Sequence, residues 1–219
     1  MILTGNGDPA WIWAGFLLAG LLWGDALRVC WRERAQWPFP ATPLLIATLS
    51  LAVLWHIRAV VQPGMSLHLL GAMLCTMVFG ARLAVLPLSL ALVMAQFSAG
   101  AEWSVLGLNA CLLVFWPIAL SRLVLALVAR LPPNMFVFIF VGGFFGSAAV
   151  VLFTGWLISL TLWLMQSYAW GPMLEDYASY WLLVAFSEAW LTGMLVTVMV
   201  VYRPELVRLF DVRRYIDRA

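Results

Sequence analysis

The sequence contains no lysine and few charges of either sign. All twelve of its basic residues are arginines, and ten acidic residues bring the charged fraction to 10% of the 219 residues. A soluble globular domain has about 25% charged residues, so this composition excludes an ordinary soluble fold. The net charge of +2 is too small to suggest binding to nucleic acid.

Motifs for catalysis and for a structural metal site are also lacking. The sequence has no phosphate-binding loop, no Cys-x-x-Cys pair and no paired acidic motif. Its three cysteines, Cys30, Cys75 and Cys111, lie in or beside apolar runs and are interpreted as small buried side chains. Ser147 lies among small residues, so we interpret it as a packing residue rather than a protease nucleophile. The chain is therefore not predicted to be an enzyme.

Long apolar runs dominate what the sequence does contain. Hydrophobic residues make up 65% of the chain, and the mean hydropathy is +1.00. Because a membrane-spanning helix needs about 20 apolar residues, these runs predict an all-α integral membrane protein. We expect seven spanning helices, at residues 10–28, 41–60, 65–80, 82–98, 103–128, 135–167 and 179–202.

The stretch from residue 65 to residue 98 is the least regular part of this pattern. It is too long for one span and too short for two full-length spans. Gly80-Ala81-Arg82 divides it, which predicts two short or tilted helices. A broken helical hairpin is the alternative.

The arginines predict the orientation of the chain in the membrane. With the N-terminus outside, seven spans place every arginine except Arg58 on the cytoplasmic side, as the positive-inside rule requires. Six spans would export either the cluster at 28–34 or the cluster at 203–218. We therefore expect one polytopic membrane domain over residues 1–202, followed by an arginine-rich cytoplasmic tail at 203–219.

The sequence has two histidines, His56 and His68, which flank a Pro63-Gly64 turn between two apolar runs. His68 is expected in the first turn of the helix 65–80, where the positive end of the helix dipole disfavours protonation. A neutral imidazole binds metals, so His68 is the leading candidate ligand, with His56 on the same outer side. Two histidines do not complete a four-ligand site. Candidates for a further ligand are Asp8, Glu102, Glu188, Met65, Asn109 and the amine of Met1.

Ionisable residues inside the spans are costly to bury, which makes each of them a candidate for function. Glu188 lies about nine residues into the last span and has no basic neighbour in sequence. It either makes a polar contact between helices, to Asn109 or a tryptophan, or lines a substrate path. Asp25 precedes Arg28 by three residues, which predicts a local ion pair.

Close helix contacts are predicted at two pairs of small residues. Gly20 with Gly24, and Gly142 with Gly146, have the spacing that lets membrane helices approach closely. The sequence therefore predicts a neighbouring helix against each pair.

Two blocks of sequence resemble a known transporter family. The run Pro63-Gly64-Met65-Ser66-Leu67-His68-Leu69-Leu70-Gly71, followed by Gly80, is similar to a conserved stretch of the CbiM/NikM family. These are the substrate-binding membrane components of energy-coupling-factor transporters for cobalt and nickel. Trp103-Ser104-Val105-Leu106-Gly107-Leu108-Asn109-Ala110, followed by Pro117, resembles the start of another helix in that family. The similarity covers residues 60–130, and residues 187–215 look like a shorter, permease-like branch.

The resemblance implies a seven-span fold with an outward-facing metal pocket in which His68 occupies a ligand position. It also implies a bacterial inner membrane location, with a coupling transmembrane subunit and paired ATPases as partners. The family's cobalt and nickel binders begin Met-His-Ile and bind the metal through the terminal amine and that histidine, whereas this chain begins Met1-Ile2-Leu3. His56 could replace the missing ligand, or the site could be lost.

Two functions are open at this point. The leading prediction is a membrane substrate-binding or permease subunit for uptake of a divalent transition metal ion, such as cobalt or nickel, energised by partner ATPases. Its predicted ligands are His68 first, with His56, Glu188, Asn109 and Met65 as further candidates. The alternative is a non-transporting membrane scaffold or assembly factor for a metal-containing complex.

Overall fold

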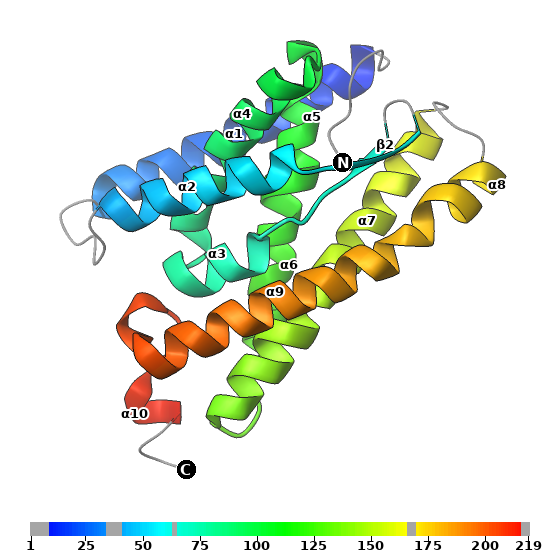
Figure 1. Ribbon diagram of the computed structural model, residues 1–219. Coiled ribbons are helices and arrows are strands. Elements are labelled where there is room, and N and C mark those ends of the chain that lie inside the picture. The colour runs from blue at the N-terminus through cyan, green and yellow to red at the C-terminus, as the bar shows by residue number, and fades with distance from the viewer. Residues whose placement is uncertain (1–8, 34–40, 63–64, 166–169, 216–219) are drawn as a thin grey trace.

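The computed structural model describes residues 9–33, 41–62, 65–165 and 170–215. Within these residues the protein is a bundle of helices with one small β-hairpin (Figure 1). Five helical segments are long and apolar enough to cross a membrane, at residues 9–32, 81–99, 103–128, 137–164 and 180–202. This confirms an all-α membrane fold.

The first half of the described chain contains the shorter elements. They are α1 (Pro9–Glu33), α2 (Ala41–His56), β1 (Ala59–Gln62), β2 (Met65–Leu67), α3 (Ala72–Phe79) and α4 (Ala81–Ala99). The second half contains two long helical segments, each with a π-helical stretch, and the last span. The first long segment contains α5 (Leu106–Ala110), the π-helical η3 (Cys111–Phe115) and α6 (Trp116–Val128), and the second contains the π-helical η4 (Val137–Phe145) and α7 (Gly146–Leu164). The last span is α9 (Tyr180–Tyr202), and the short helices α8 (Trp170–Met173) and α10 (Val212–Tyr215) lie before and after it.

The bundle has two distinct ends. The C-terminal ends of α1, α6 and α9 lie toward one end, while the β-hairpin and α8 lie toward the other (Figure 1). This distribution agrees with the arginine pattern, because Arg32 in the last turn of α1, Arg130 just after α6 and Arg203 just after α9 lie at these ends.

Two of the expected helix boundaries were wrong. The second helix ends at His56, and residues 59–62 form a strand paired antiparallel with 65–67. Residues 65–80 are therefore a strand, a non-helical segment and the eight-residue α3, rather than one tilted helix. The β-branched Val60 and Val61 favour the extended conformation, and the pairing of the two strands satisfies backbone groups that a helix would otherwise satisfy.

The predicted break at Gly80 is confirmed. Gly80 has a φ of 78° and separates α3 from α4. The chain after α9 returns to this break, where the backbone N–H groups of Arg208 and Leu209 donate to the carbonyls of Val78 (3.1 Å) and Met77 (3.2 Å). Arg208 Nη1 also donates to the carbonyl of Phe79, at 3.2 Å. These contacts satisfy carbonyls that the end of a helix leaves without partners.

The short helix α3 lies in the interior of the bundle. Seven of its eight residues are buried: Ala72, Met73, Cys75, Thr76, Met77, Val78 and Phe79. It contacts α4, α6, α7 and α9. A helix that is apolar on all sides is stable only when protein or lipid surrounds it, which explains the composition of this segment.

The backbones of α1 and α5 approach closely at two glycines that the sequence did not single out. A Cβ on Gly107 would lie 2.6 Å from the backbone nitrogen of Phe16, and one on Gly15 would lie 2.7 Å from that of Leu108. The expectation for Gly20 and Gly24 was wrong, because nothing lies within 4 Å of a Cβ at either position. In the second predicted pair, Gly146 is tightly packed and Gly142 is in ordinary contact with its neighbours.

At Gly146 of that pair, a Cβ would lie 2.9 Å from both Met73 and Val124. At Gly142, the nearest neighbour of a Cβ would be Leu125, at 3.7 Å.

Substituting Gly107 with leucine should force α1 and α5 apart, because the neighbouring atoms are backbone and cannot rotate away. We expect a loss of about 1–3 kcal/mol in the free energy of unfolding, as for other overpacked interiors. Thermal unfolding of the purified protein in detergent measures this. Gly20→Leu is the matched control and should unfold like the wild type; equal losses in the two variants would contradict the packing at Gly107.

Candidate functional site

The site is built around residues 68–71, the non-helical segment that connects β2 to α3. Glu188, in the middle of α9, holds this segment from the other side of the bundle. Its Oε2 accepts from the backbone N–H of Leu70 at 2.8 Å, and its Oε1 accepts from that of Gly71 at 2.7 Å. Glu188 is only 1% exposed. A carboxylate that accepts two backbone N–H groups replaces the water that this segment lacks.

Two aromatic side chains hold the same segment from further elements. Trp55, at the end of α2, donates from its indole Nε1 to the carbonyl of Leu70 at 3.1 Å. Its ring also packs against the imidazole of His68, with centroids 4.9 Å apart. Tyr177, before α9, donates from its hydroxyl to the carbonyl of Ser66 at 3.4 Å. The backbone around His68 is thus fixed by side chains from three different parts of the chain.

Gly71 ends the segment with a left-handed backbone. Its φ is 71°, and a Cβ at this position would lie 2.5 Å from Cδ2 of Leu51. Only glycine meets both requirements without strain. The glycine in the quoted family-like run is therefore explained by the turn that leads from His68 into α3.

The imidazole of His68 has one ring nitrogen in use and one free. Nδ1 lies 2.9 Å from the carbonyl oxygen of Leu69, which can only accept, so we assign the proton to Nδ1. Nε2 then carries a lone pair, and it is buried with no hydrogen-bond partner in the described part of the chain. Burial lowers the pKa of His68 well below its usual range, which keeps the ring neutral. This is the tautomer and charge state of a metal-binding histidine.

The other predicted ligands have different surroundings. His56 is exposed, and its Nδ1 lies 3.4 Å from Oγ of Ser98. Asn109 is fully buried and donates from Nδ2 to Oε1 of Gln96 at 2.9 Å, and Gln96 donates to the carbonyl of Glu102 at 2.7 Å. Hydrogen bonds already engage Asn109 and the backbone of Glu102 at the start of the fifth span.

For the three remaining ligand candidates, the structure does not describe the side chain. Met65 pairs with Gln62 in the hairpin, but its side chain is not among those described. Asp8 and Met1 lie outside the described residues. Across residues 9–33, 41–62, 65–165 and 170–215, no group of three or more His, Cys, Asp or Glu side chains could hold a metal ion. Among the candidate ligands whose side chains the structure describes, Glu188 contacts the His68 segment, through backbone groups.

Sequence reasoning found Glu188 but not its partners. The expected partner was Asn109 or a tryptophan, whereas the observed partners are the N–H groups of Leu70 and Gly71. Trp55 and Tyr177 were missed altogether. Trp55 stands directly before His56 in a chain with thirteen tryptophans, so no compositional signal distinguishes it.

A comparison with models of protein families shows which family this chain belongs to. The family model described as "CbiM: Cobalt uptake substrate-specific transmembrane region" matches residues 5–206. The chain belongs to the CbiM family. The resemblance inferred from the two sequence blocks is confirmed, and the match extends well beyond residues 60–130.

The fold of this CbiM-family protein is similar to a solved structure titled "Crystal Structure of an Truncated Transition metal Transporter". The TM-score is 0.73 at 18% sequence identity, over 92% of this chain and 99% of that one. At this identity the likeness shows a shared fold. No curated protein matches the sequence.

Removing the Glu188 carboxylate should destabilise the protein in steps. Glu188→Gln keeps one carbonyl oxygen to accept an N–H group, whereas Glu188→Ala leaves both N–H groups of the segment buried without partners. Each such loss costs about 1–3 kcal/mol, so the alanine variant should lose at least about 2 kcal/mol in the free energy of unfolding and the glutamine variant less. Denaturant unfolding in detergent measures the series.

The matched control for this series is Glu205→Gln. Glu205 forms an exposed ion pair with Arg203, at 3.3 Å, and exposed pairs contribute little. If Glu188→Ala were as stable as Glu205→Gln, the carboxylate would not be holding the segment.

Gly71→Ala should deform the entry to α3 more than a left-handed glycine elsewhere in the chain. Gly100 also has a positive φ, of 62°, but nothing lies within 4 Å of a Cβ there. Both alanine variants bear the left-handed penalty of about 1–2 kcal/mol, whereas Gly71→Ala also displaces Leu51. Unfolding of the two variants side by side measures the difference, and identical curves would contradict the predicted crowding.

Proposed function

We propose that this protein is the substrate-binding membrane subunit of an uptake system for a divalent transition metal ion. The observation that carries the proposal is the buried Nε2 of His68, a lone pair without a hydrogen-bond partner among the described residues. An unpartnered buried polar atom is costly, and it is tolerated where a ligand supplies the partner. Imidazole nitrogen is a suitable ligand for cobalt, nickel, copper and zinc, so this donor alone gives no selectivity among the four metals.

Glu188 acts beside this ligand in our proposal, by holding the segment that carries His68. Each carboxylate oxygen accepts one backbone N–H group, from Leu70 and from Gly71. These residues follow His68 by two and three positions, so the negative charge of Glu188 lies beside the segment that carries the imidazole. A divalent cation near His68 would gain from this charge without direct ligation. Asn109 and Met65 remain the proposed additional donors, and the exposed His56 is not required.

Energy for uptake has to come from partner subunits. The sequence contains no nucleotide-binding motif, so the chain does not hydrolyse a nucleotide itself and we propose no enzymatic activity. A coupling transmembrane subunit and ATPase subunits in the bacterial inner membrane would supply the drive. The membrane domain of residues 1–202 would bind the ion, with the arginine-rich tail 203–219 on the ATPase side.

His68→Ala should weaken metal binding at least tenfold, because it removes the proposed donor atom. Wild type and variant are purified in detergent, their metal content is measured by mass spectrometry, and affinities for Co²⁺, Ni²⁺, Cu²⁺ and Zn²⁺ are compared by competition titration. His56→Ala is the matched control and should bind like the wild type, because its imidazole is exposed and beside Ser98.

Two outcomes would overturn the proposal. If His68→Ala and wild type bound the same metals with equal affinity, His68 would not be a ligand. If the wild type bound none of the four ions but co-purified stably with another membrane complex, the non-transporting scaffold or assembly factor would be the better account.

A further inference from the structure

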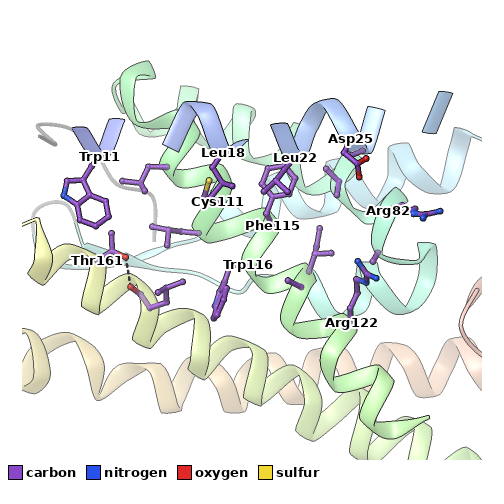
Figure 2. A pocket seen from close by; sticks show the side chains of 18 residues that line it. Trp11, Leu18, Leu22, Asp25, Arg82, Cys111, Phe115, Trp116, Arg122 and Thr161 are labelled. Carbon is purple, nitrogen blue, oxygen red and sulfur yellow. Dashed lines mark hydrogen bonds between the residues drawn. The ribbon is translucent and has the colours of Figure 1, made fainter. Parts of the chain in front are cut away.

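A groove lies between α1, the start of α4 and the segment that contains α5 and α6 (Figure 2). Its volume is about 480 Å³. Leu18 and Leu22 of α1 form one wall, and Phe115 and Ala119 of the facing segment form the other. The walls are therefore apolar side chains on two neighbouring helices. The residues of the proposed metal site do not line this groove, whereas Leu108, Leu112 and Ile118 of the core form its floor.

The charges of the groove gather at one end. Asp25, Arg82 and Arg122 lie together there, while Trp11 lies at the opposite end (Figure 2). Arg82 stands in the first turn of α4 and Arg122 in the second half of α6, both assigned to the cytoplasmic side by the arginine pattern. Among the described residues that line the groove, these three carry a charge, and two of them are arginines.

Arg122 has no hydrogen bond or ion pair with any residue that the structure describes. The same holds for Asp25, so the predicted local pair with Arg28 was wrong among the described residues. A guanidinium at membrane depth is costly unless an anion or water meets it. Arg122 is exposed on the surface of the described part of the chain, so an anion from the surroundings can reach its guanidinium.

We propose that the groove binds an anionic phospholipid of the cytoplasmic leaflet. The phosphate would be held by Arg122 with Arg82, and an acyl chain would run along Leu22 and Leu18. Basic pockets between membrane helices on the cytoplasmic side are suited to anionic headgroups, and guanidinium binds phosphate through two parallel hydrogen bonds. A partner helix is the less favoured occupant, because it would need a carboxylate in register with both arginines. The inference does not depend on the metal proposal.

The test is native mass spectrometry of the full chain, titrated in detergent with phosphatidylglycerol or with phosphatidylcholine of the same acyl chains. The wild type should prefer phosphatidylglycerol. Arg122→Gln should lose about fivefold in this affinity, and Arg82→Gln with Arg122→Gln more, since each arginine near a membrane phosphate contributes by about that factor. Arg130→Gln, beyond the end of α6, is the matched control and should bind as the wild type does.

A second variant tests the apolar part of the groove without changing its charge. Ala119→Phe fills the space between the walls and should weaken binding of both lipids, while gel filtration and unfolding confirm that it is folded. Equal losses in Arg122→Gln and Arg130→Gln, or unchanged binding in Ala119→Phe, would overturn the proposal. So would an Arg122→Gln variant that retains the lipid but no longer co-purifies with a membrane partner, because the groove would then be a protein interface.

Discussion

The arrangement of this protein depends on one carboxylate that holds two backbone N–H groups inside a helical bundle. Residues 68–71 have no helical structure, yet His68, Leu70 and Gly71 are buried. Non-helical backbone at membrane depth is tolerated only when protein groups take the place of water. Glu188 does this for two N–H groups and Trp55 for one carbonyl. The break in the backbone leaves His68 outside the helix, with a buried nitrogen available.

Hydropathy and the placement of the arginines were sufficient to predict the long helices, because both signals are local in sequence. The break at Gly80 was also foreseeable, since a glycine beside an arginine interrupts an apolar run. The hairpin was not. Its strands have four and three residues, and in an apolar background such short stretches cannot be told from the ends of helices. Helix contacts at Gly15 and Gly107 were missed because neither glycine is followed four residues later by a second glycine.

For the candidate site, the sequence identified the residue types but not the contacts. Two histidines and one isolated glutamate are conspicuous in a chain so poor in ionisable groups. Their relation was not visible, because Glu188 meets Leu70 and Gly71 across 118 and 117 residues. The sequence ranked His68 above His56 but did not predict that His56 is exposed and that His68 is buried against Trp55. Such differences arise from tertiary packing, on which local periodicity carries no information.

The length of α3 has a consequence for the path of an ion. Eight residues of helix extend for about 12 Å, less than half of a hydrocarbon core of about 30 Å. The segment with His68 enters one end of this helix, and the chain after α9 binds the carbonyls at the other. In the proposed function, an ion at His68 would lie near one end of α3, with residues 208 and 209 at the other end. Release of that ion toward the far end of α3 would then require this short helix to move, and residues 208 and 209 are hydrogen-bonded to it directly.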